Sequence, residues 1–187
     1  MNAVLTIKKT GSARMESIHT RYIGGGTRRT FVVGLILTML FALERTADAR
    51  SSAPPPPHIL FICKAGTVKS AVAREIFRRR AAERGVSVIA FSRGITPEEH
   101  VSPALRQQLI ADGIDSTRDG LQKLEQKDLE AADIVVVFDP LPRTLVAPRA
   151  LDWSALPSMN DTYPLARTDL DRRIDALLDA IAQGRAR

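Results

Sequence analysis

Residues 58–71 read HILFICKAGTVKSA, and this stretch decides the expected fold. Four apolar residues, 59–62, are followed directly by Cys63, the only cysteine of the chain. A continuous apolar run of this length is typical of a strand that is covered on both faces. The small residues after Cys63 then lead into a helix that begins near Ser70. The pattern predicts a strand, a short loop and a helix, with a thiol at the end of the strand.

A thiol in this place has a chemical consequence. The start of a helix attracts anions because its first N–H groups lack partners within the helix and its dipole is positive there. The same field favours the thiolate, which is the nucleophilic form of a cysteine. Cys63 is therefore a candidate nucleophile for phosphoryl chemistry. The competing interpretation is that Cys63 is an inert small hydrophobic residue in the core.

Apolar and amphipathic segments alternate along the rest of the chain. Further strands are expected at 87–91, 134–138 and 150–153, and helices at 70–84, 103–111, 121–131 and 165–183. A turn is expected at 92–94. Strands that alternate with helices form a parallel sheet with right-handed crossovers, which is an α/β fold. Ligands of such sheets bind beyond the carboxyl ends of the strands, where Cys63 and Asp139 both fall.

The composition suits one folded domain. A chain of 187 residues with 44% hydrophobic content is long enough to bury a substantial core. Seven basic and three acidic residues lie in 1–49, so this part carries +4 of the total charge of +6. The remainder has an ordinary surface balance, which argues against a nucleic-acid partner. A single cysteine excludes an intramolecular disulfide, and no metal or nucleotide motif predicts a cofactor.

Residues 1–49 have the parts of an export signal. The apolar run 31–43 follows two arginines at 28–29 and precedes an Ala-x-Ala cleavage pattern at 47–49. The run has 13 residues, and a membrane-spanning helix needs about 20. Residues 27–31 also resemble the twin-arginine export motif.

These features predict a periplasmic or secreted protein with no stable membrane association once the signal is cleaved. A stiff Pro-rich linker is expected over 50–57 and the folded domain over 58–187. Two alternatives stay open. In the first, the segment is a membrane anchor that is not cleaved. In the second, the start codon is misassigned and the protein is cytoplasmic.

Five residues separate Cys63 from Lys69-Ser70, and this spacing resembles the Cys-x5-Arg-Ser loop of the low-molecular-weight protein tyrosine phosphatases and the related arsenate reductases. Further landmarks that are similar to the family lie at 92–94, 104–115 and 132–136. The resemblance covers residues 58–182. It implies a flavodoxin-like, doubly wound, four-stranded parallel sheet in the order 2-1-3-4, with helices on both faces.

The resemblance also implies roles for the loop. Cys63 would attack phosphorus and form a phosphocysteine that water hydrolyses, and Ser70 would hydrogen-bond the sulfur. The substrate would be a phosphorylated protein or a small aryl phosphate, while the oligomeric state is left open. Phosphoryl oxygens would be bound by the backbone amides of Lys64, Ala65, Gly66, Thr67, Val68 and Lys69.

Two positions depart from the family pattern. Lys69 replaces the loop arginine, so the charge is kept but the flat fork that grips two oxygens is lost. Direct alignment puts Ser158 where the family has its Asp-Pro general acid. We expect Asp161 to serve as the acid and Asp139 to cap a loop. These departures leave an alternative function, a catalytically impaired phosphate- or phosphoprotein-binding module, and arsenate reduction is less favoured because one cysteine cannot relay a disulfide.

Overall fold

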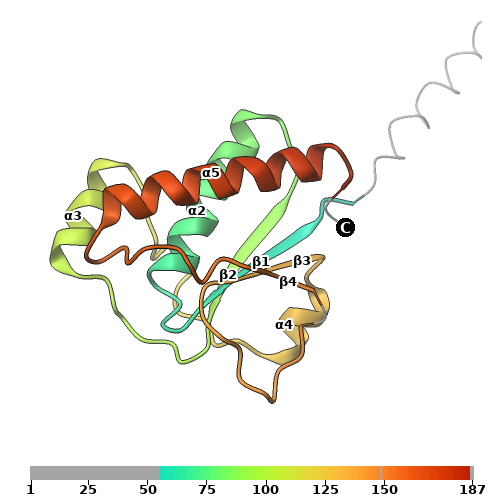
Figure 1. The fold of residues 1–187 in the computed structure, drawn as a ribbon, viewed down its shortest axis with the longest axis horizontal. Coiled ribbons are helices and arrows are strands. Elements are labelled where there is room, and N and C mark those ends of the chain that lie inside the picture. The colour runs from blue at the N-terminus through green and yellow to red at the C-terminus, as the bar shows by residue number, and fades with distance from the viewer. Residues whose placement is uncertain (1–54, 148, 186–187) are drawn as a thin grey trace, which may run out of the picture. The chain divides into compact units, whose positions relative to one another are not determined.

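A computed structural model of the protein describes residues 55–147 and 149–185 (Figure 1). The expected export signal over 1–49 and residues 50–54 of the expected linker lie outside the described residues, so both stay predictions. Residues 55–57 have no regular secondary structure. Within the described ranges, no helix combines the length and the apolar character that crossing a membrane requires.

Strands and helices alternate along the described part of the chain. The strands are β1 (His58–Cys63), β2 (Ile89–Gly94), β3 (Ile134–Val137) and β4 (Ala150–Asp152). The helices are α2 (Lys69–Glu83), α3 (Pro103–Ala111), α4 (Gln126–Ala131) and α5 (Tyr163–Ala182). Every expected strand and helix is therefore present, with some boundaries shifted.

The strands form one parallel sheet in the order β2-β1-β3-β4. This confirms the predicted α/β class and the predicted strand order. β1 lies in the interior of the sheet, where Ile59 pairs with Ala90 on one side and with Ile134 on the other. Because all strands run the same way, their carboxyl ends meet at one edge, and Cys63 ends the central strand β1.

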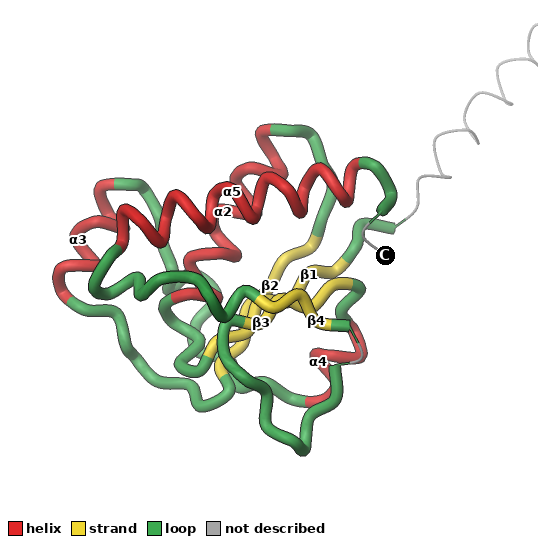
Figure 2. The backbone as a smooth tube through the Cα atoms, viewed as in Figure 1, coloured by secondary structure: helices red, strands yellow, loops and turns green. Residues whose placement is uncertain are grey.

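Alternate residues of β1 serve two separate cores. Ile59, Phe61 and Cys63 belong to a large cluster that α2, α3 and α5 cover, whereas Leu60 and Ile62 face a smaller cluster with α4. Figure 2 shows the three longer helices on one side of the sheet and α4 on the other. Burial on both faces explains why the β1 sequence is apolar throughout instead of alternating.

The expected boundaries were wrong in two places. Strand β2 extends through the expected turn at 92–94 and begins later than the expected strand at 87–91. The expected helix at 121–131 is shortened to α4, because residues before it are extended beside the end of β2. Gly94 donates its N–H to the carbonyl of Gln122, and its own carbonyl accepts the N–H of Leu124. These backbone hydrogen bonds replace a helical turn that the sequence pattern favoured.

Two helix boundaries follow the expected capping chemistry. The Ser102 side chain accepts a hydrogen bond from the Leu105 N–H at 3.1 Å, directly before the proline that opens α3. Gly85 follows α2 with φ of +66°, the left-handed conformation that glycine adopts after a helix.

Candidate active site

Cys63 is held at the end of β1 with its sulfur against two polar groups. The residue is 3% exposed, and its Sγ lies 3.0 Å from the Ser70 Oγ. The Gly66 N–H donates to the same sulfur at 3.1 Å. The Gly66 amide is the donor in its contact, whereas either the Ser70 hydroxyl or the thiol is the donor in the other. The Ser70 contact predicted from the family resemblance is therefore present in the geometry.

The loop between Cys63 and α2 offers backbone N–H groups to an anion. Two of the six predicted amides already have protein acceptors, since Gly66 donates to sulfur and Lys64 donates to the Asp139 Oδ2 at 2.8 Å. The other four donate to no acceptor within residues 55–147 and 149–185. These four are the amides of Ala65, Thr67, Val68 and Lys69. Neighbouring unpartnered amides at a helix start form an anion-binding site.

The segment that follows β2 fixes the loop from the outside. Glu98 donates its N–H to the Ala65 carbonyl at 3.1 Å, and the Thr67 hydroxyl donates to the Glu98 carbonyl at 2.9 Å. The same Thr67 oxygen accepts the N–H of His100 at 3.2 Å. Thr67 was expected only as an amide donor, and the structure adds this side-chain role. Its hydroxyl ties two segments that are about thirty residues apart in sequence.

Gly66 and Gly94 allow the loop and the end of β2 to touch backbone to backbone. Gly66 has φ of +82°. A Cβ at Gly66 would lie 2.9 Å from the Gly94 Cα, and a Cβ at Gly94 would lie 2.8 Å from the Ala65 carbonyl oxygen. Gly66 is thus required for both its conformation and its space, whereas Gly94 is required for space alone.

A cavity of about 220 Å³ opens over this loop. Its lining contains cations, carboxylates and small side chains from four separate segments. The lining residues are Cys63, Lys64, Ala65, Val68, Lys69, Glu98, His100, Asp139, Ser158, Met159 and Asn160. The structure therefore brings the thiol and most of the predicted loop to one cavity, and it adds Glu98 and His100, for which the sequence carried no recognised motif.

Lys69 contributes a positive charge to the cavity. It is half-buried at the first position of α2, and its side chain has no hydrogen bond or ion pair to any other described residue. An ammonium group in this position is available to pair with a bound oxyanion. It acts as a point charge and cannot form the two parallel hydrogen bonds of a guanidinium.

The carboxylates at the cavity are not the ones that the sequence favoured. Asp161 is exposed, its Oδ2 accepts a hydrogen bond from the Ser158 hydroxyl at 2.6 Å, and it is absent from the lining. Asp139 and Glu98 are in the lining instead. Asp139 was interpreted as a loop cap, and its carboxylate does accept a backbone N–H, but the N–H belongs to the loop between Cys63 and α2. The catalytic role of Asp161 stays a prediction.

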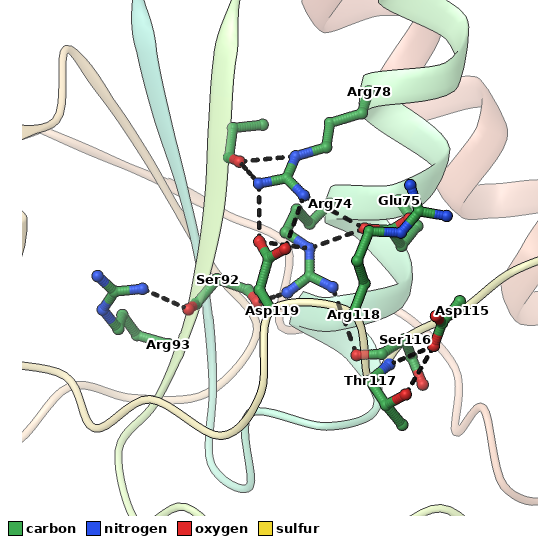
Figure 3. Close-up of polar contacts among 11 residues, drawn as sticks. Arg74, Glu75, Arg78, Ser92, Arg93, Asp115, Ser116, Thr117, Arg118 and Asp119 are labelled. Atoms are coloured by element: carbon green, nitrogen blue, oxygen red, sulfur yellow. Dashed lines mark hydrogen bonds and ion pairs between the residues drawn. The ribbon is translucent and has the colours of Figure 1, made fainter.

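A buried arginine of α2 connects this helix to strand β2 (Figure 3). Arg74 is 1% exposed, and its Nη1 donates to the Ser92 hydroxyl at 2.7 Å on strand β2. Its Nε lies 3.1 Å from Glu75 and 3.4 Å from Asp119. Two carboxylates and a hydroxyl therefore compensate the buried charge. This cluster links α2 to strand β2 and to the segment that carries Asp119.

The aspartates, glutamates, histidines and cysteine of the described ranges form no cluster that could hold a metal ion. The groups that the cavity and its loop offer to a ligand are the thiol, the free amides, the lysines and the carboxylates.

Comparison with known proteins relates part of this chain to a known family. Residues 58–147 match the family model for low molecular weight phosphotyrosine protein phosphatase. A comparison with curated protein sequences found no match.

Three solved structures are similar in fold. The low molecular weight protein tyrosine phosphatase from T. tengcongensis is 21% identical, with a TM-score of 0.54 over 66% of this chain and 98% of that one. The thioredoxin-dependent arsenate reductase of Corynebacterium glutamicum is 24% identical, with a TM-score of 0.55 over 80% of this chain and 75% of that one. A cysteine-to-serine mutant of the arginine phosphatase YwlE of Bacillus subtilis, with that active-site serine phosphorylated, is 17% identical. Its TM-score is 0.57, over 68% of this chain and 97% of that one.

At these identities the structural likeness shows a shared fold, and the family model adds the sequence match over the strand, loop and helix that carry Cys63. Residues 58–147 thus match this phosphatase family, as the sequence predicts, and the described part of the chain has the same fold as the solved phosphatases and arsenate reductases.

Proposed function

We propose that this protein hydrolyses phosphate monoesters through Cys63, in the manner of a protein tyrosine phosphatase. One observation carries the proposal. The Cys63 sulfur lies 3.0 Å from the Ser70 hydroxyl and 3.1 Å from the Gly66 amide, at the floor of a cavity whose loop has further free amides. A thiolate and an oxyanion site side by side are the two parts that in-line attack on a phosphoryl group requires.

In the first step, the sulfur lone pair forms a bond to phosphorus while the bond between phosphorus and the leaving oxygen breaks. The free amides of the loop hold the phosphoryl oxygens during this transfer. In the second step, water attacks phosphorus and the sulfur leaves as a thiolate. The Ser70 hydroxyl donates a hydrogen bond to that departing sulfur.

Lys69 in place of arginine is expected to lower the rate of turnover. Its charge attracts the dianionic substrate, but it lacks the bidentate geometry of arginine in the transition state. We expect turnover to be slower than with arginine by about 10²–10³-fold, with a smaller effect on substrate binding.

We propose phosphorylated protein or a small aryl phosphate as the substrate class, because the family is named for phosphotyrosine. The expected export signal would deliver the enzyme to the periplasm or the exterior. Sequencing the N-terminus of the protein recovered from cells tests the export proposal directly, since cleavage after residue 49 is expected.

The experiment for the proposed activity traps the covalent intermediate. Purified protein is mixed with p-nitrophenyl phosphate, quenched in acid and analysed by mass spectrometry for one added phosphoryl group on the peptide with Cys63. Steady-state release of p-nitrophenol is measured in parallel, with Cys63→Ser as the control. Release that does not exceed the Cys63→Ser background, with no phosphopeptide, would remove the proposal.

A second candidate is a phosphate- or phosphoprotein-binding module without useful turnover. Lys69 in the loop and an uncharged Ser158 at the cavity support it. This candidate predicts vanadate or phosphate binding by calorimetry together with negligible hydrolysis, and it predicts that Lys69→Arg restores measurable turnover. Brisk hydrolysis by the unmodified protein contradicts it.

Arsenate reduction is not favoured for this chain. The similar reductase from Corynebacterium glutamicum depends on thioredoxin. Passing a disulfide to a partner requires a second thiol on the enzyme or in its coupling system, and this chain has one cysteine.

A further inference from the structure

We propose that Asp139 is the general acid that protonates the leaving group, a role that rests on the proposed phosphatase activity. The family resemblance implies that Ser158 stands at the position of this acid, and Asp161 is absent from the lining of the cavity. Asp139 lines the cavity together with Cys63.

The sheet places Asp139 beside the nucleophile. Strands β1 and β3 are parallel neighbours, with Ile62 paired to Val137. The Phe138 N–H donates to the Ile62 carbonyl at 2.8 Å, and this contact carries the pairing one residue further. Asp139 is therefore level with the first loop residue after Cys63. Its position is set by the central part of the sheet, which is a rigid support for a catalytic group.

One hydrogen bond orients the Asp139 carboxylate. Its Oδ2 accepts the Lys64 N–H at 2.8 Å. Its Oδ1 accepts no hydrogen bond from another residue of the described ranges, and this oxygen is available to carry a proton. A carboxyl group with one oxygen fixed to the anion-binding loop and one oxygen free has the arrangement of a positioned proton donor.

Glu98 is the other carboxylate in the lining, and it is held less firmly. Its backbone is fixed by Ala65 and Thr67. Its side chain is exposed and makes no hydrogen bond or ion pair to a residue that the structure describes. A longer, exposed side chain loses more rotamer freedom when it is brought to one orientation. Holding the Asp139 carboxyl group at a fixed leaving group therefore costs less side-chain entropy than holding that of Glu98.

The proton balance assigns Asp139 two opposite tasks. When the sulfur of Cys63 bonds to phosphorus, the electron pair of the breaking bond goes to the leaving oxygen, and the protonated Asp139 gives its proton to that oxygen. An alcohol departs and Asp139 becomes a carboxylate. It then takes a proton from the attacking water, phosphate departs, sulfur returns to thiolate and Asp139 is protonated again.

Five other charged or titratable groups line the cavity with Asp139. They are Cys63, Lys64, Lys69, Glu98 and His100.

The test is Asp139→Asn with two substrates that differ in how much they need an acid. The amide oxygen of asparagine still accepts the Lys64 N–H, so the loop is retained while the proton is lost. Phenyl phosphate expels a strongly basic phenolate and needs protonation, whereas p-nitrophenyl phosphate expels a weak base and needs little. We expect kcat to fall about 10²–10³-fold for phenyl phosphate and less than about tenfold for p-nitrophenyl phosphate.

Asp133→Asn is the matched control. Asp133 lies at the opposite end of the same pair of strands, where its Oδ2 accepts the His58 N–H at 2.7 Å. It therefore makes the same kind of hydrogen bond to β1 but is absent from the cavity lining. This variant should keep both activities.

Three results would overturn the assignment. Equal losses on both substrates in Asp139→Asn would show that the residue only supports the loop. A selective loss on phenyl phosphate in Asp161→Asn or Glu98→Gln, with Asp139→Asn unaffected, would assign the acid elsewhere and leave the proposed phosphatase activity standing. Absence of turnover and of phosphocysteine in the unmodified protein would remove the proposed activity, and this role with it.

Discussion

Gly94→Ala should damage the anion-binding loop from a strand that does not itself contact the anion. The added Cβ would lie 2.8 Å from the Ala65 carbonyl oxygen and 3.1 Å from the Gly66 nitrogen. Both neighbours are backbone atoms, so no side chain can rotate away. To reach an ordinary contact distance of 3.4 Å, the loop and the strand must separate by about 0.6 Å.

That displacement has two expected costs. Overpacking of this kind destabilises a protein by about 2 kcal/mol. The Ala65 carbonyl also accepts the Glu98 N–H, so moving it disturbs the segment that supports the loop. Loss of one charge-assisted hydrogen bond to the anion, about 1.5 kcal/mol, weakens anion binding roughly tenfold.

Two matched glycines separate crowding from backbone strain. Gly85 has φ of +66° and nothing within 4 Å of an added Cβ, so Gly85→Ala should cost about 1 kcal/mol of strain and leave anion binding unchanged. Gly66→Ala combines φ of +82° with a 2.9 Å contact and should cost about 3 kcal/mol or more.

The free energy of unfolding is measured by chemical denaturation, and anion binding by the vanadate concentration that protects Cys63 from alkylation. The expected order of destabilisation is Gly66→Ala, then Gly94→Ala, then Gly85→Ala. The reasoning fails if Gly94→Ala is no more destabilising than Gly85→Ala and binds vanadate as tightly as the unmodified protein.

Two further predictions concern the frame that holds the site. Arg74→Met removes the buried cation from Glu75 and Asp119 and should lower the free energy of unfolding by about 3 kcal/mol. The control Arg172→Met, at an exposed ion pair, should lower it by about 0.5 kcal/mol. Similar losses for the two variants in a denaturant titration would contradict this prediction. Burial, followed by the hydrogen bond to Asp112, raises the pKa of Tyr163 from 10.0 to about 12. The unfolded chain then loses this proton first, so stability should decline as pH rises from about 10 to about 12, and Tyr163→Phe should remove that part of the decline in denaturation midpoints.

The arrangement of strands and helices was predictable because it depends on short-range patterns. Three features each predict a local structure from a few consecutive residues: the apolar run of β1, the serine cap before Pro103 and the glycine after α2. The loop between Cys63 and Ser70 was predictable for the same reason. Its strand, thiol and helix start are consecutive in the chain, so their geometry follows from local backbone preferences.

The errors and omissions all involve contacts between distant segments. Residues 121–124 are not helical because this segment forms backbone hydrogen bonds with Gly94. The local sequence pattern does not show this contact. The same holds for the hydroxyl of Thr67, which joins its loop to Glu98 and His100. Propensity is a weak preference, and pairing with a neighbouring strand overrides it.

Which carboxylate enters the cavity is decided only by the folded chain. Asp139 lies just after β3 and Asp161 lies in the turn before α5, and neither local sequence shows which carboxylate enters the cavity. Asp139 faces the cavity because β3 pairs directly with β1, and this pairing places Asp139 level with Lys64. Asp161 is turned toward Ser158 instead. Adjacent residues can reveal a nucleophile and its anion-binding loop, but the partner that reaches them across the sheet depends on strand order and register, which arise only when the whole sheet is formed.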